Sequence, residues 1–139
     1  MAIITDSLKA DSYQVSSGAA SQHIDELIEA LRTQPTKIFN CTRQMLDAAA
    51  ATQGAVDAVK SIEVEAMAVA AADKANSNDA KRKAATQSHL DANPYYRNAC
   101  RKREQMISTE TDLKNAHQRL RDEFSAFKAI ARLISSGAE

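Results

Sequence analysis

The chain has 139 residues, of which 44% are hydrophobic but only 4% aromatic, and it carries 18 basic and 18 acidic side chains. Its length suits a single domain, and the scarcity of glycine (three) and proline (two) argues against a loop-rich or all-β fold. No apolar run approaches the ~20 residues that a membrane-spanning helix needs. We therefore expect an all-α protein without a membrane span.

The charges are unevenly distributed along the chain. Residues 1–73 carry five basic and ten acidic side chains, whereas residues 74–139 carry thirteen basic and eight acidic ones. The two halves therefore have net charges of −5 and +5. Opposite net charges favour pairing between the halves, either within one chain or between neighbouring chains.

Cysteine usage and the first residues indicate the compartment. The chain has two cysteines, and Met1–Ser21 lacks the basic start and the continuous apolar core of a signal peptide. We expect a cytoplasmic protein, or one exported by a route without a cleaved signal peptide.

The first segment, residues 1–20, is Ser-rich and shows no sustained hydrophobic period. It predicts a flexible N-terminal arm that orders on a partner. A short amphipathic helix is predicted over residues 21–33, because its large apolar residues follow the spacing i, i+3, i+4, i+7. These residues are Ile24, Leu27, Ile28 and Leu31.

Gln34-Pro35 is expected to end this helix, since proline disfavours helical conformation at the residue before it. A second, long helix is predicted over residues 36–75. Small and apolar residues recur at every seventh position in two neighbouring series. The first series is Ile38, Met45, Thr52, Val59 and Ala66, and the second is Cys41, Ala48, Ala55, Ile62 and Val69. Gly54, in mid-helix, indicates a close helix crossing.

Residues 76–79, Asn-Ser-Asn-Asp, are typical of caps and turns. A helix is predicted over residues 80–91, but it has almost no apolar face. It is either a short solvated helix or a continuation of the preceding one. Asn93-Pro94 then reads as the N-cap and first residue of another helix.

The last predicted helix covers residues 94–135 and has the clearest pattern. One series of every seventh residue is Ala99, Met106, Leu113, Leu120, Phe127 and Ile134, and all six are apolar. The companion series is Arg103, Glu110, His117, Phe124 and Ala131. The 3.5-residue period is that of a coiled coil.

These elements predict one helical domain over residues 21–136. Its fold is an antiparallel long-helix hairpin, coiled-coil-like, with the short helix packed at one end; Ala66 then lies opposite Met106. Two helices enclose a poor core. The end formed by Val56–Ala72 and Ala99–Leu113 must therefore be completed by the arm or by oligomerisation into a helical bundle. The predicted packing residues are Val56, Val59, Ile62, Val69, Met106 and Leu113.

Catalytic and metal sites are not indicated. None of the three histidines follows a glutamate at the Glu-x-x-His spacing of helical di-iron sites, and no Cys-x-x-Cys occurs. Cys100 and His117 lie on one helix, ~25 Å apart along it, and cannot form a catalytic pair. We expect no cofactor and no enzymatic activity.

Basic residues and tyrosines cluster between positions 81 and 103. Basic side chains neutralise phosphates, and tyrosine rings stack on bases. The other interpretation is that these cations balance the acidic half of this chain or of a neighbour. The candidate polyanion-binding residues are Lys81, Arg82, Lys83, Tyr95, Tyr96, Arg97, Arg101, Lys102 and Arg103.

The pattern as a whole favours a non-enzymatic assembly or scaffold protein that self-associates, or docks on a helical partner, through coiled-coil faces. Its organisation is typical of a building block of a phage or secretion structure. The alternative is a nucleic-acid-binding helical module that uses the basic segment Lys81–Arg103.

Overall fold

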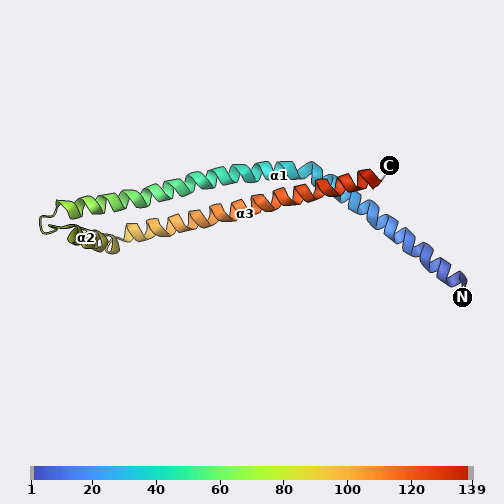
Figure 1. Ribbon diagram of the computed structural model, residues 1–139, viewed down its shortest axis with the longest axis horizontal. Helices are drawn as coiled ribbons and strands as arrows, with labels where there is room; N and C mark the ends of the chain where they lie inside the picture. Colours follow the sequence, from blue (N-terminus) through green and yellow to red (C-terminus); the bar gives the residue numbers. More distant parts are fainter. Residues whose placement is uncertain (1, 138–139) are drawn as a thin grey trace. The chain divides into compact units, whose positions relative to one another are not determined.

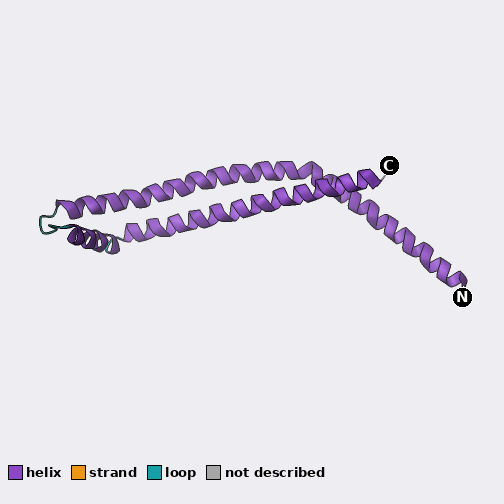
Figure 2. Cartoon of the chain, viewed as in Figure 1, coloured by secondary structure: helices purple, strands orange, loops and turns teal. Residues whose placement is uncertain are grey.

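The computed structural model describes the backbone of residues 2–137 and the side chains of residues 20–137. In this part of the chain all regular structure is helical, and no strand occurs (Figure 2). The helices are α1 (Ala2–Ala72), α2 (Asp79–Asp91) and α3 (Pro94–Gly137) (Figure 1). The predicted all-α class is therefore confirmed.

The chain divides into two compact units. Unit 1 comprises Met1–Asn40 and His117–Glu139, and unit 2 comprises Cys41–Ala116. Each unit contains a segment of α1 and a segment of α3, and unit 2 also contains α2.

α1 continues through Pro35, where the sequence predicts a boundary. The proline ring removes one backbone hydrogen bond from the helix. The neighbouring Gln34 side chain is buried, and its Nε2 donates to the Leu120 carbonyl oxygen (3.1 Å) and to the Glu123 carboxylate (3.2 Å). These bonds attach this turn of α1 to α3 within unit 1, which explains why the helix does not end here.

The predicted helices over residues 21–33 and 36–75 are thus parts of one helix. The backbone of residues 2–20 also belongs to α1. The side chains of residues 2–19 lie outside the described residues, so the docking arm and the domain boundary at residue 20 stay predictions.

The turn between α1 and α2 is built by asparagines. The Asn76 side chain donates to the Ala70 carbonyl oxygen (2.9 Å) and so caps the end of α1. Asn78 is the N-cap of α2, since its Oδ1 accepts from the Lys81 backbone N–H (2.9 Å). Because the end of α1 and the start of α2 are each capped, α2 is a separate helix and not a continuation of α1.

α2 lies against the last turns of α1. Met67 and Ala71 line a cavity with the first turns of α2, and Ile62 and Ala66 line another with His89 near its end. Leu90 is the buried side chain of α2. α2 therefore covers the end of α1 that the sequence analysis assigns to the arm or to another subunit.

α3 begins where the sequence predicts. The Tyr95 backbone N–H donates to Asn93 Oδ1 (3.0 Å), and Pro94 is the first helical residue. The first turn of α3 already contacts α1: the Tyr96 hydroxyl donates to the Glu63 carboxylate (3.2 Å).

This contact gives a different register from the predicted one, in which Ala66 lies opposite Met106. The prediction assumed that the two long helices end level with each other. Because α2 occupies the last turns of α1, α3 starts beside Glu63 instead.

Burial in unit 2 follows one side of α1. The buried apolar residues of this helix are separated by four, seven or fourteen positions, which keeps them on one side. They are Cys41, Ala55, Val59, Ala66 and Ala70. The facing residues of α3 are half-buried and recur every three or four positions: Tyr96, Ala99, Arg103, Met106, Glu110 and Leu113.

Unit 1 is packed more loosely. None of its described apolar side chains is buried, and Gln34 is its buried residue. Leu27 and Leu31 of α1 and Leu120 and Phe124 of α3 are half-buried.

Among residues 20–137, Val59 is the largest fully buried side chain, with 1% of its surface exposed, whereas Val69 is 50% exposed. Val59→Ala should lower the free energy of unfolding by about 2 kcal/mol, because it removes buried apolar groups and leaves a cavity. Val69→Ala is the matched control and should cost less than half as much. Chemical denaturation followed by circular dichroism measures both. Equal losses would contradict the assigned packing.

Gly54 does not lie at a helix crossing within the described residues, since a Cβ atom added there meets nothing within 4 Å. Gly54→Ala should therefore raise the free energy of unfolding by about 1 kcal/mol, through helix propensity alone. Ala58→Gly, at another exposed position of α1, should lower it by a similar amount. A loss of stability in Gly54→Ala would show that another helix packs closely on this glycine.

Candidate interaction surfaces

The predicted packing residues occupy different environments in unit 2. Val59 is buried, whereas Val56, Ile62, Met106 and Leu113 are half-buried. Val69 is exposed, and the next residue, Ala70, takes the buried position. Ala70 continues the buried side of Val59 and Ala66, whereas Val69 lies about 100° away from it around the helix.

The packing side of α3 includes the Glu110 carboxylate. Lys114 lies 3.1 Å from it, and the Thr52 hydroxyl of α1 lies beside it. This hydroxyl is also 2.9 Å from the Ala48 carbonyl oxygen, and its single hydrogen can be donated to only one of the two acceptors at a time. Donation from Thr52, followed by the Lys114 ammonium, lowers the pKa of Glu110. A charged carboxylate is therefore tolerated at a position where coiled coils usually place apolar residues.

Tyr96, Glu63 and Cys100 form a second polar group in unit 2. A hydrogen-bonding contact with the Cys100 side chain, desolvation and the hydrogen bond to Glu63 raise the pKa of Tyr96 to about 12. The ring is half-buried. Tyr96 therefore joins α3 to α1, and its hydroxyl is already engaged.

The outward side of α1 in unit 2 exposes large apolar residues. Leu46 and Val64 are 66% and 60% exposed, and their separation corresponds to about five whole turns, so they lie on the same side of the helix. Ala50 is exposed near the same line. Between them, Gln53 donates to the Asp57 carboxylate (2.9 Å). We call Leu46, Ala50 and Val64 the outer face of α1.

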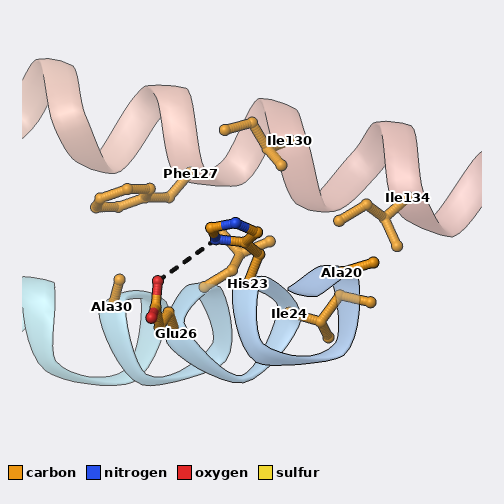
Figure 3. A pocket seen from close by; sticks show the side chains of 9 residues that line it. Ala20, His23, Ile24, Glu26, Ala30, Phe127, Ile130 and Ile134 are labelled. Atoms are coloured by element: carbon orange, nitrogen blue, oxygen red, sulfur yellow. Dashed lines mark ion pairs between the residues drawn. The ribbon is translucent and has the colours of Figure 1, made fainter. Parts of the chain in front are cut away.

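Unit 1 contains an apolar groove of about 640 Å³ between α1 and α3. In Figure 3, Ile130 and Ile134 extend from α3 towards α1, and the His23 ring lies on the side of α1 that faces α3. His23 Nδ1 is 3.6 Å from a Glu26 carboxylate oxygen. The other lining residues are Ala20, Ile24, Leu27, Ala30 and Phe127.

The candidate polyanion-binding residues separate into exposed and engaged groups. Arg103 and Tyr96 are half-buried on the packing side, whereas Tyr95 is 76% exposed. Arg82 pairs with Asp79 (3.4 Å) on its own helix. The other five cations are exposed and form no ion pair with any described residue. They are Lys81, Lys83, Arg97, Arg101 and Lys102.

No metal-binding group emerges from residues 20–137: nowhere in this range do three His, Cys, Asp or Glu side chains converge. Both cysteines are free thiols, and Cys41 lies 3.7 Å from the Leu113 carbonyl oxygen. None of the helices in the described part of the chain combines the length and apolar character needed to cross a bilayer.

Gln34 is the important residue that the sequence analysis missed. The Gln34-Pro35 pair predicts a helix boundary, yet Gln34 is buried and joins α1 to α3 in unit 1. A signal was present, because Gln34 continues a three-and-four spacing on both sides of the proline. The full series is Leu27, Leu31, Gln34, Ile38 and Cys41.

No protein-family model matches the chain, and no curated protein and no solved structure is significantly similar to it.

The raised pKa of Tyr96 makes stability pH-dependent in alkali. The stabilisation is fully present below pH ~10, where an unfolded tyrosine is still protonated. It is lost as the pH rises from there through about 12, the pKa of Tyr96 in the folded protein. Absorbance at 295 nm should show a tyrosine that ionises late, and Tyr96→Phe should remove this phase. Persistence of the late phase in Tyr96→Phe would contradict the assignment.

Proposed function

We propose that the protein is a non-enzymatic helical assembly protein that self-associates through exposed apolar faces. The exposed apolar side chains carry this proposal. In residues 20–137, large apolar residues of both units lie at the surface, among them Phe39 (60% exposed), Leu46 (66%) and Leu133 (72%). Exposed apolar surface of this kind marks sites of contact with another protein.

The small buried core points in the same direction. Among the described residues, the buried apolar side chains are four small residues, Cys41, Ala55, Ala66 and Ala70, together with Val59 and Leu90. Small side chains bury little apolar area, and burial stabilises by only ~25 cal/mol per Å². Further burial between copies would supply stability that one chain lacks.

The internal contacts support the antiparallel, coiled-coil-like hairpin as the assembling element. In unit 2, Cys41 contacts Leu113 and Glu63 contacts Tyr96, so residue numbers fall along α3 as they rise along α1. The three-and-four spacing of the half-buried residues is that of knobs-into-holes packing. A second hairpin placed on the first would form a helical bundle.

Two surfaces are available for a second copy. The outer face of α1 in unit 2 presents Leu46 and Val64, and the groove in unit 1 presents Ile130 and Ile134. Exposed Leu and Ile on a helix, and an apolar groove between helices, are both common modes of helix recognition.

Charge complementarity also favours a second copy as the partner. In unit 2 the α1 segment has more acidic than basic residues, whereas α2 has more basic ones. In residues 20–137, each Lys or Arg that forms an ion pair does so with an acid on its own helix. The opposite charges of different helices therefore remain available for contacts between chains.

Molar mass measured by chromatography with light scattering, over a concentration series, tests this function. We expect a defined dimer or larger species whose population rises with concentration. Leu46→Glu should weaken association by roughly 30-fold, because a buried leucine contributes ~2 kcal/mol. Ile130→Glu tests the groove in the same way.

Ala58→Glu is the matched control, since Ala58 is exposed on α1 away from the outer face. It should associate like the wild type. A mass equal to one chain at every concentration would overturn the proposed function.

A further inference from the structure

The start of α3 presents positive charge and an aromatic ring to solvent. Arg97, Arg101 and Lys102 are exposed and form no ion pair with any described residue. Tyr95 is the most exposed of the large apolar side chains in residues 20–137. Uncompensated charge next to an exposed aromatic ring is a surface that a partner can use.

Helix geometry places these four residues on the exposed half of α3. Arg97 and Arg101 are one turn apart, and Tyr95 and Lys102 are close to two turns apart, so each pair is aligned along the helix. The side that faces α1 carries Tyr96 and Arg103, which are half-buried. Because Tyr95 and Arg97 lie about 160° apart around the helix, the two pairs form two lines on this exposed half, which together we call the cationic face.

The helix end itself adds to the positive potential. The first turn of α3 contains no acidic residue, although an Asp or Glu there would offset the partial positive charge of a helix N-terminus. Instead, it contains Arg97. Like charges one turn apart, as in Arg97 and Arg101, also disfavour the helix. Glu104 is the nearest acid on the adjoining turn, and it forms no ion pair with Arg101.

The backbone of Tyr95 is fixed while its ring is free. Its N–H donates to Asn93 Oδ1 (3.0 Å), which holds the residue at the helix start. Its neighbour Tyr96 differs, because the Tyr96 hydroxyl is engaged by Glu63. Tyr95 is therefore the aromatic ring available for stacking.

We propose that the cationic face binds single-stranded nucleic acid, with Arg97, Arg101 and Lys102 on phosphates and Tyr95 stacked on a base. Proteins that bind single strands without sequence preference combine these two elements, a basic track and an aromatic platform. Lys81 and Lys83, exposed in the first two turns of α2 in the same unit, add positive potential. The exposed ring favours nucleic acid over the acidic side of a second copy, because a protein carboxylate gains nothing from stacking.

Fluorescence anisotropy of a labelled oligothymidylate of about 20 nucleotides, mixed with the full chain at 50 mM salt, tests the proposal. We expect binding that weakens steeply as salt is raised. The combined variant Arg97→Ala, Arg101→Ala, Lys102→Ala should make the slope of log K against log salt shallower by about 2, since each phosphate contact on a single strand contributes ~0.7. Tyr95→Ala should weaken binding about tenfold at constant slope, because stacking is not ionic.

The matched control removes the same charge from the other end of α3: Arg119→Ala, Arg121→Ala, Arg132→Ala, all at exposed positions. It should leave binding within about twofold of the wild type. Circular dichroism and light scattering on each variant confirm that helix content and molar mass are unchanged.

Three results would overturn the proposal. The first is absence of binding at low salt, and the second is an equal loss in the control variant, which would indicate diffuse charge. The third is dissociation of the oligomer in the Arg97, Arg101, Lys102 variant, because these cations would then belong to an interface between copies. This last result would leave the proposed self-association intact.

Discussion

The burial of small side chains along one side of α1 is the interaction on which unit 2 depends. Ala55 and Val59 lie on the side of α1 that faces α3, and Ala66 and Ala70 are buried where α2 lies against α1. Small residues allow helices to approach closely, but each contributes little apolar area. The packing is therefore specific in position and modest in energy, and it depends on many weak contacts placed at regular intervals.

A seam of this kind leaves most of each helix exposed. A long helix that buries one stripe still presents its other sides to solvent, and on α1 these sides carry Leu46 and Val64 in addition to alanines. The polar residues on the seam, such as Glu110 with Thr52, restrict which neighbour can be accommodated. The proposed self-association and the cationic face of α3 both depend on this exposed surface. Self-association uses its apolar side chains, and the cationic face uses its charged ones.

Much of the helical pattern could be predicted from the sequence, because it depends on local signals. Asn93 and Pro94 marked the start of α3, and the heptad spacing of this helix includes the half-buried Met106 and Leu113. The errors concern contacts between distant residues. Proline predicted a helix end, but Gln34 is held by hydrogen bonds to α3 that no local rule includes. The register depends on α2, which occupies the last turns of α1 and whose own sequence has almost no apolar face. The basic residues of the surface could be recognised in the sequence. That they form no ion pairs could be recognised only from the three-dimensional structure.

The anchoring of α2 has a consequence for local opening of the chain. This helix has one buried residue, Leu90, and is joined to its neighbours by the turn at Asn76 and the break at Asn93. Segments with few buried contacts open at lower free energy than the rest of a protein. The amides of α2 should therefore exchange with solvent before those of the adjoining α1 and α3 turns in unit 2. Each opening uncovers the buried Ala66, which lines a cavity with His89 of α2, while the contact between Glu63 and Tyr96 is kept, so the end of α1 is a surface that the protein reveals transiently.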